Sequence, residues 1–180
     1  MRIIKTKAYQ FEELDEQTKQ KAIDNCRYRN VDDDFWYEFI EEDLYSVGIE
    51  LRSFDINRGN YAHLFIDNMF ISCDKIIKFY GLNCEIYKIA QRYIEESDFI
   101  KDKIDNLECI ENDDSDEEHL DKLFHLDKDL EDLDEEYYKE FSEEVLSMLR
   151  KEFEYVTSDE HIIECFDINQ CEFTENGKLI

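Results

Sequence analysis

No proline interrupts this chain of 180 residues, and its four glycines stand far apart from one another. Proline breaks helices and glycine weakens them, so a chain with so few of either can form long uninterrupted helices. The hydrophobic share is 42%, which is too high for a disordered polyanion because burying that much apolar surface offsets the entropy lost on folding. We therefore expect a folded chain with long helices, forming one domain or two small ones that share a core.

The net charge is −27, from 48 acidic and 21 basic residues. A surface this negative repels phosphates, so we expect no direct binding of nucleic acid and none of anionic membranes. No apolar run approaches a signal peptide or the roughly 20 residues that span a bilayer. We expect a cytoplasmic protein, in the host cytoplasm if a phage encodes it. The six cysteines form no Cys-x-x-Cys pair, which predicts reduced and mostly buried thiols.

Alternation of apolar and polar residues predicts strands at three places. Residues 2–9 alternate around Ile3 and Tyr9. Residues 49–56 and 61–65 alternate on either side of a turn at Gly59, which predicts a β-hairpin. Residues 172–180 contain the turn pair Asn176-Gly177 and predict a closing strand.

Helical spacing of apolar residues predicts helices through the rest of the chain. Asp15 and Ser158 are expected N-caps, and Gly48 and Gly81 are expected helix ends. The expected helices cover residues 15–30, 35–47, 74–80, 84–109, 130–155 and 158–166. The predicted class is α+β, with a small antiparallel sheet of the N-terminal strand, the hairpin and the C-terminal strand packed against these helices. The predicted organisation is an α/β subdomain over 1–72, an acidic helical segment over 73–156, and a helix and strand over 157–180 that return to the N-terminal sheet.

Residue patterns that carry catalysis are weak in this chain. The four histidines show no metal-ligand spacing, and the segment from Asp55 to Gly59 fits a hairpin turn better than a calcium loop. Cys165 lies four residues after His161, which would place the two on one helix face, but a structural cysteine is the favoured interpretation. We therefore predict a protein that is not an enzyme and that holds no cofactor and no metal.

The acidic residues are concentrated in one stretch. Residues 111–144 hold 17 acids and 3 lysines, so they carry −14 of the −27. As a helix this stretch would extend about 51 Å, with one net charge per ~3.6 Å, against one phosphate per ~3.4 Å on a strand of B-DNA. Residues 111–118 alone fit a solvated loop, whereas from Asp127 onward leucines and tyrosines alternate with the acids, which predicts an ordered acidic helix face.

A second acidic cluster, residues 32–43, combines acids with aromatic residues. The favoured interpretation is a helix start with Phe35, Trp36 and Phe39 in the core; the alternative is a surface for a basic partner. The predicted partner-binding residues of the two clusters are Asp113, Asp114, Asp116, Glu117, Glu118, Asp127, Asp129, Glu131, Asp132, Asp134, Glu135, Glu136, Glu140, Asp33, Asp34, Tyr37 and Glu38.

Three segments carry a family resemblance: YQFEELDEQTKQKAI (residues 9–23), NVDDDFWYEFIEED (residues 30–43) and GIELRSFDI (residues 48–56). They resemble small uncharacterised acidic proteins of phages and mobile elements of low-GC bacteria. In charge and size the chain is similar to phage anti-restriction and anti-CRISPR proteins, several of which mimic DNA. The resemblance implies an inhibitor that docks an acidic face into the basic groove of a host defence nuclease or its complex. An adaptor or antitoxin-like module that binds a basic protein is the alternative, and a metal-dependent enzyme is the least favoured.

Overall fold

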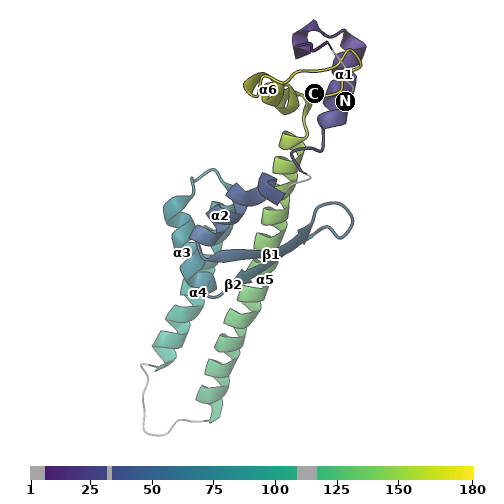
Figure 1. The fold of residues 1–180 in the computed structure, drawn as a ribbon. Coiled ribbons are helices and arrows are strands. Elements are labelled where there is room, and N and C mark those ends of the chain that lie inside the picture. Colours follow the sequence, from purple (N-terminus) through teal and green to yellow (C-terminus); the bar gives the residue numbers. More distant parts are fainter. Residues whose placement is uncertain (1–6, 32–33, 109–116) are drawn as a thin grey trace, which may run out of the picture. The chain divides into compact units, whose positions relative to one another are not determined.

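The structure is a computed structural model that describes residues 7–31, 34–108 and 117–180 (Figure 1). Helices and one two-stranded antiparallel sheet make up its regular structure, so the predicted α+β class is confirmed. The chain divides into two compact units. A terminal unit comprises Met1–Phe39 and Leu149–Ile180, and a central unit comprises Ile40–Met148. The first and last segments of the chain thus build one unit together, while its middle builds the other.

The elements follow one another with short connections. They are a 3-10 helix at Phe11–Glu13, α1 (Glu16–Cys26), a 3-10 helix at Asp34–Tyr37, α2 (Glu38–Ser46), β1 (Ile49–Asp55), β2 (Tyr61–Ile66), α3 (Met69–Phe79), α4 (Glu85–Glu108), α5 (Glu117–Val156) and α6 (Asp159–Ile168). α5 has 40 residues and is therefore about 60 Å long at 1.5 Å per residue. Over the described ranges, no helix is both long enough and apolar enough to cross a membrane.

The predicted hairpin is confirmed in the central unit, where β1 pairs with β2. Its turn is closed by the carboxylate of Asp55, which accepts hydrogen bonds from the backbone N–H groups of Asn57, Arg58 and Gly59 at 2.8–2.9 Å. These bonds lower the pKa of Asp55, with that from Asn57 contributing most. Both oxygens of this carboxylate therefore serve the turn, as the hairpin interpretation requires.

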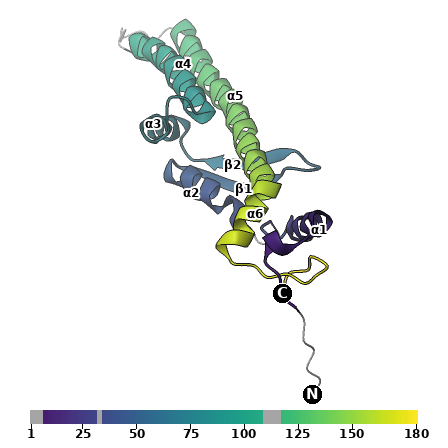
Figure 2. The ribbon, with the colours of Figure 1, turned by 90° about the horizontal axis from the view of Figure 1, so that it is seen from above.

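Two long helices form the framework of the central unit. α4 and α5 lie side by side in both views (Figures 1 and 2). The apolar side of α5 is buried, and its buried residues in this unit are Leu133, Tyr137, Phe141, Val145 and Leu146. Tyr93 of α4 meets Tyr137 edge to face, with 5.4 Å between ring centroids. One side of α5 is thereby committed to packing, which leaves its opposite side to solvent.

The terminal unit is held by an aromatic cluster between its first and last segments. The rings of Phe11, Phe166 and Phe173 pack pairwise, with centroids 4.9–6.1 Å apart. Gly177 has a φ of +75°, and a Cβ there would lie 2.8 Å from the carbonyl oxygen of Thr18. Glycine at this position therefore allows the C-terminal turn to approach α1 closely.

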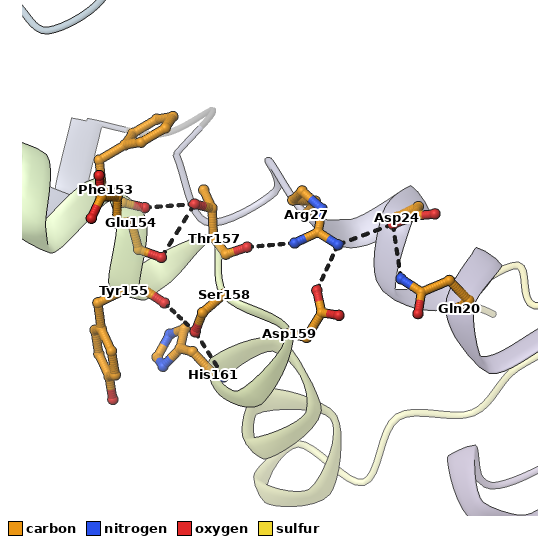
Figure 3. A network of polar contacts seen from close by, with 10 residues as sticks. All are labelled: Gln20, Asp24, Arg27, Phe153, Glu154, Tyr155, Thr157, Ser158, Asp159 and His161. Carbon is orange, nitrogen blue, oxygen red and sulfur yellow. Dashed lines mark hydrogen bonds and ion pairs between the residues drawn. The ribbon is translucent and has the colours of Figure 1, made fainter. Parts of the chain in front are cut away.

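Arg27 links the end of α1 to the start of α6 (Figure 3). Its guanidinium donates to the carbonyl oxygen of Thr157 at 2.7 Å and to the carboxylates of Asp159 and Asp24 at 2.6 and 3.0 Å. Ser158 caps α6 as predicted, because its hydroxyl accepts from the N–H of His161. Asp15 likewise caps α1 by accepting from the N–H of Thr18.

The predicted three-part sheet is wrong, since within the described residues the sheet has only the two strands of the hairpin. Residues 1–6 of the expected N-terminal strand lie outside the described residues. Tyr9 and Phe173 form an isolated bridge, and Phe173 forms a second one with Leu179. The terminal segments therefore pair at single points, because the turn around Gly177 folds residues 173–179 back on themselves before a ladder can extend.

Two further expectations differ from the structure. α5 begins at Glu117, 13 residues before the predicted start at Leu130. The thiols are also less buried than predicted: Cys26 and Cys73 are buried, Cys165 and Cys171 are half-buried, and Cys84 is exposed. All five are free, while Cys109 lies outside the described residues.

Candidate acidic docking face

The side of α5 that faces away from its buried stripe is acidic. Its exposed acids include a set that we call the outer acidic face: Asp129, Glu131, Asp132, Glu135 and Glu136. At 100° per residue, these side chains centre on the side of the helix opposite Tyr137 and Phe141. The helix thus separates an apolar face that packs from a negative face that does not.

The charges of this face lie close together. Asp129 and Asp132 are three residues apart, and Glu136 follows four residues later, so neighbouring Cβ atoms lie about 5–6 Å apart. The helical residues 117–144 hold 13 acids and 3 lysines, a net charge of −10. That is about one net charge per ~4.2 Å of helix, close to the ~3.4 Å phosphate spacing along one DNA strand.

Two of the predicted site residues are engaged within the protein. Glu140 forms an ion pair with Arg92 of α4 at 2.6 Å, and Asp134 accepts a hydrogen bond from the hydroxyl of Tyr93 at 2.7 Å. Burial and the hydrogen bond to Asp134 raise the pKa of Tyr93, which therefore stays protonated as a donor. Asp134 and Glu140 hold α4 against α5, so the outer acidic face is made by their neighbours.

Beside Asp134 the surface carries both positive and negative side chains. A hollow of about 610 Å³ is lined by residues of both signs, among them Asp134, Glu135, Lys101 and Lys139. The ammonium of Lys101 lies 3.4 Å from the centroid of the Phe70 ring. The lysines offset the acids here, so this hollow is not uniformly negative as the outer acidic face is.

Several predicted partner-binding residues are not part of the outer acidic face. Asp113, Asp114, Asp116 and Asp33 lie outside the described residues. Glu117 and Glu118 belong to the first turn of α5, and Asp34 begins the 3-10 helix Asp34–Tyr37. Asp127 is exposed on α5 but lies to one side of the outer acidic face.

The second predicted cluster differs from its favoured interpretation. Phe35 and Phe39 were expected in the core, yet 71% and 79% of their surfaces are exposed. Trp36 is half-buried and packs edge-on against Tyr37 and Phe153, as predicted for a packed residue. Glu38 is exposed between the two phenylalanines. This part of the terminal unit therefore presents two large apolar rings together with the carboxylate of Glu38.

Sequence reasoning missed the acids of α4. Glu95, Asp98, Asp102 and Asp105 are all exposed, and they recur at intervals of three and four residues. That spacing was the available signal, because it places like charges along one side of a helix. The negative charge of the central unit therefore extends beyond α5.

The chain has no significant match among protein-family models, curated proteins or solved structures. The resemblance to acidic phage proteins and to DNA-mimicking inhibitors therefore stays a prediction.

Proposed function

We propose that this protein is a non-enzymatic inhibitor of a host defence nuclease, of the anti-restriction or anti-CRISPR class, that occupies a basic nucleic-acid groove. The observation that carries the proposal is the outer acidic face, five exposed carboxylates on an uninterrupted helix whose other side is anchored in a core. A rigid row of charges at near-phosphate spacing is what a groove built for a DNA or RNA strand would recognise.

The repulsion between the charges of the outer acidic face destabilises the helix, and this cost in free energy supports a binding role. Like charges at i, i+3 and i, i+4 spacing destabilise a helix by about 0.2–0.5 kcal/mol per pair. A cationic groove would turn this repulsion into attraction and would steer association. A solubilising segment would need neither the buried stripe nor the ion pair of Arg92 with Glu140.

The test is inhibition of purified restriction and CRISPR nucleases, measured as DNA cleavage and as binding affinity across salt concentrations. We expect affinity for the inhibited nuclease to fall as salt rises, and the variant D129K/D132K/E136K to lose inhibition. The matched control is D167K/E172K/E175K, which reverses three exposed acids of the terminal unit and changes net charge equally. Circular dichroism verifies that both variants fold.

Four outcomes decide the proposal. Loss of inhibition in the α5 variant alone supports a located docking face. Equal loss in both variants contradicts it, because net charge rather than position would then govern binding. No loss in either variant also contradicts it, because the outer acidic face would then contribute nothing to binding. Failure of the wild type to inhibit any tested nuclease contradicts the nuclease as target.

The exposed rings of Phe35 and Phe39 favour a second candidate, an adaptor that binds a basic protein through this part of the terminal unit. Aromatic rings beside acids fit Arg-rich surfaces, since guanidinium groups stack on rings and pair with carboxylates. Replacing Phe35 and Phe39 by serine should then abolish capture of an Arg-rich peptide, while D129K/D132K/E136K leaves it intact. The opposite pattern excludes this function.

A further inference from the structure

The hollow of about 610 Å³ beside Asp134 lies entirely within the central unit. Its lining comes from residues 66–70, where β2 ends and α3 begins, and from α4 and α5. Its volume falls within the range of about 300–1,000 Å³ that is usual for small-molecule sites. The docking function proposed above uses only Glu135 of the residues that line it.

Two ammonium groups line the hollow, one from Lys101 of α4 and one from Lys139 of α5. Lys101 is half-buried, and its Nζ lies 3.4 Å from the centroid of the Phe70 ring, a contact that holds the ammonium at the wall. Among the described residues, neither lysine forms an ion pair, although the chain has 48 acids for 21 bases. Both ammonium groups are therefore available to an anionic group of a ligand.

Three carboxylates, those of Asp67, Asp134 and Glu135, line the same hollow. Asp134 is already engaged, because the hydroxyl of Tyr93 donates to it at 2.7 Å. Over the part of the chain that the structure describes, Asp67 and Glu135 make no ion pair and no side-chain hydrogen bond. These two carboxylates can therefore accept hydrogen bonds from the N–H groups of a ligand.

Most of the remaining lining is apolar or aromatic. It consists of the side chains of Ile66, Met69, Phe70 and Leu130 and the rings of Tyr93 and Tyr138. An apolar group that lies against these side chains is removed from water, which favours its binding. The hollow thus combines positive groups, negative groups and an apolar wall.

The net charge of −27 restricts the kind of ligand that suits this hollow. The field of the whole protein opposes the approach of an anion. A ligand that is only cationic would be repelled by Lys101 and Lys139 and would leave both of them unpaired. A zwitterion avoids both costs, because it is neutral overall and meets each set of charges with its opposite.

We infer that the hollow binds a free α-amino acid with a large apolar side chain. Lys101 and Lys139 bind the carboxylate of the amino acid, and Asp67 and Glu135 bind its ammonium group. The apolar wall covers its side chain. An α-amino acid carries both charges and the side chain on one carbon, so a single small molecule engages all three parts of the lining.

The test is isothermal titration calorimetry of the full-length protein with phenylalanine, methionine and alanine. We expect saturable binding of phenylalanine and methionine, and binding of alanine that is about tenfold weaker or more, because alanine leaves the apolar wall uncovered. Phenylalaninamide lacks the carboxylate and N-acetylphenylalanine lacks the ammonium group. Each of these analogues should bind about tenfold more weakly than phenylalanine, since one set of charged partners is then unused.

Variants assign the charges of the ligand to their partners. K101M/K139M should lower the affinity for phenylalanine by about tenfold or more and should bind phenylalaninamide as tightly as phenylalanine. D67N/E135Q should correspondingly lose the preference for phenylalanine over N-acetylphenylalanine. The matched control is K88M/K128M, which changes one lysine of α4 and one of α5 outside the hollow and should bind like the wild type. Circular dichroism verifies that the variants fold.

The inference is overturned if phenylalanine shows no saturable binding, or if either analogue binds the wild-type protein as tightly as phenylalanine does. It is also overturned if K101M/K139M and K88M/K128M bind phenylalanine equally. The comparison of ligands uses the unaltered protein, so it decides the inference even where a variant fails to fold.

Discussion

The hydroxyl of Tyr138 bonds to both backbone groups of Leu64: it accepts from the N–H and donates to the carbonyl oxygen, each at 3.1 Å. Leu64 belongs to β2, whose outer edge has no further strand in the two-stranded sheet. A side chain of α5 thereby takes the place of a third strand at one residue. Hydrogen bonds to the free backbone groups at a strand edge help to stabilise a two-stranded sheet.

Replacing Tyr138 by phenylalanine should destabilise the central unit by about 1–2 kcal/mol, because two partly buried backbone groups lose their partner. Urea unfolding measures the loss, and hydrogen exchange at the Leu64 amide should quicken. The control is Y45F, which removes the hydroxyl of an exposed tyrosine and should change the free energy of unfolding by less than about 0.5 kcal/mol. Equal effects of the two changes would show that the bonds to Leu64 contribute nothing.

Replacing Arg27 by alanine should destabilise the terminal unit by about 1–2 kcal/mol, since the carbonyl of Thr157 and the carboxylate of Asp159 lose a charged donor. Lysine keeps the charge but cannot reach both groups at once, so R27K should lie between wild type and R27A. Thermal unfolding measures the series, with R58A at the exposed hairpin turn as control. An R27K variant as stable as wild type would contradict a role for the forked geometry.

The carboxylate of Asp15 should make the terminal unit sensitive to acid. The backbone N–H of Thr18, and next its hydroxyl, lower the pKa of Asp15. A lowered pKa in the folded state contributes stability that is present above the unfolded value of about 3.9 and is lost as pH falls through the folded value. Asparagine also caps helices but does not titrate.

D15N should therefore have a lower melting temperature than wild type at pH 6, and the difference should shrink as pH falls below the unfolded value of about 3.9. Melting curves at half-unit intervals from pH 6 downward measure the convergence. A difference that stays constant across the range would show that the charge of Asp15 does not stabilise the fold.

Local signals in the sequence identified much of this fold. Asp15, Ser158 and Gly48 mark helix ends through the conformations and hydrogen bonds of single residues, and these are confirmed. The apolar stripe of α5 is likewise a local pattern, and its burial follows from its spacing. The start of α5 was missed because its acids suggested a loop, although negative charge is favourable in the first turn of a helix.

Features that depend on distant partners were harder to predict. Residues 2–9 and 172–180 have strand-like alternation, but a strand needs a ladder, and Tyr9 meets Phe173 at a single bridge. Phe39 lies five residues before Leu44, about 140° around the helix, so burying Leu44 turns Phe39 toward solvent. The outer acidic face was predictable because helix periodicity places five of the seven exposed acids in 127–136 on one side of the helix. The contacts of Asp134 and Glu140 with α4, in contrast, required the tertiary structure.

Neutralising part of the outer acidic face should stabilise the protein while weakening its proposed activity. D129N/D132N/E136Q removes like-charge neighbours that each cost about 0.2–0.5 kcal/mol, so a gain of about 1 kcal/mol is expected at low salt. Screening weakens repulsion between exposed charges, and the gain should shrink in 0.5 M salt, where the Debye length is only about 4 Å. The control D167N/E172Q/E175Q changes net charge equally but neutralises exposed acids of the terminal unit, and its gain should be smaller. Urea unfolding at both salt concentrations measures all three proteins. If the D129N/D132N/E136Q variant is less stable than wild type, or if its gain in stability is the same at both salt concentrations, charge repulsion does not destabilise α5. A cationic partner would then have no repulsion along this helix to relieve.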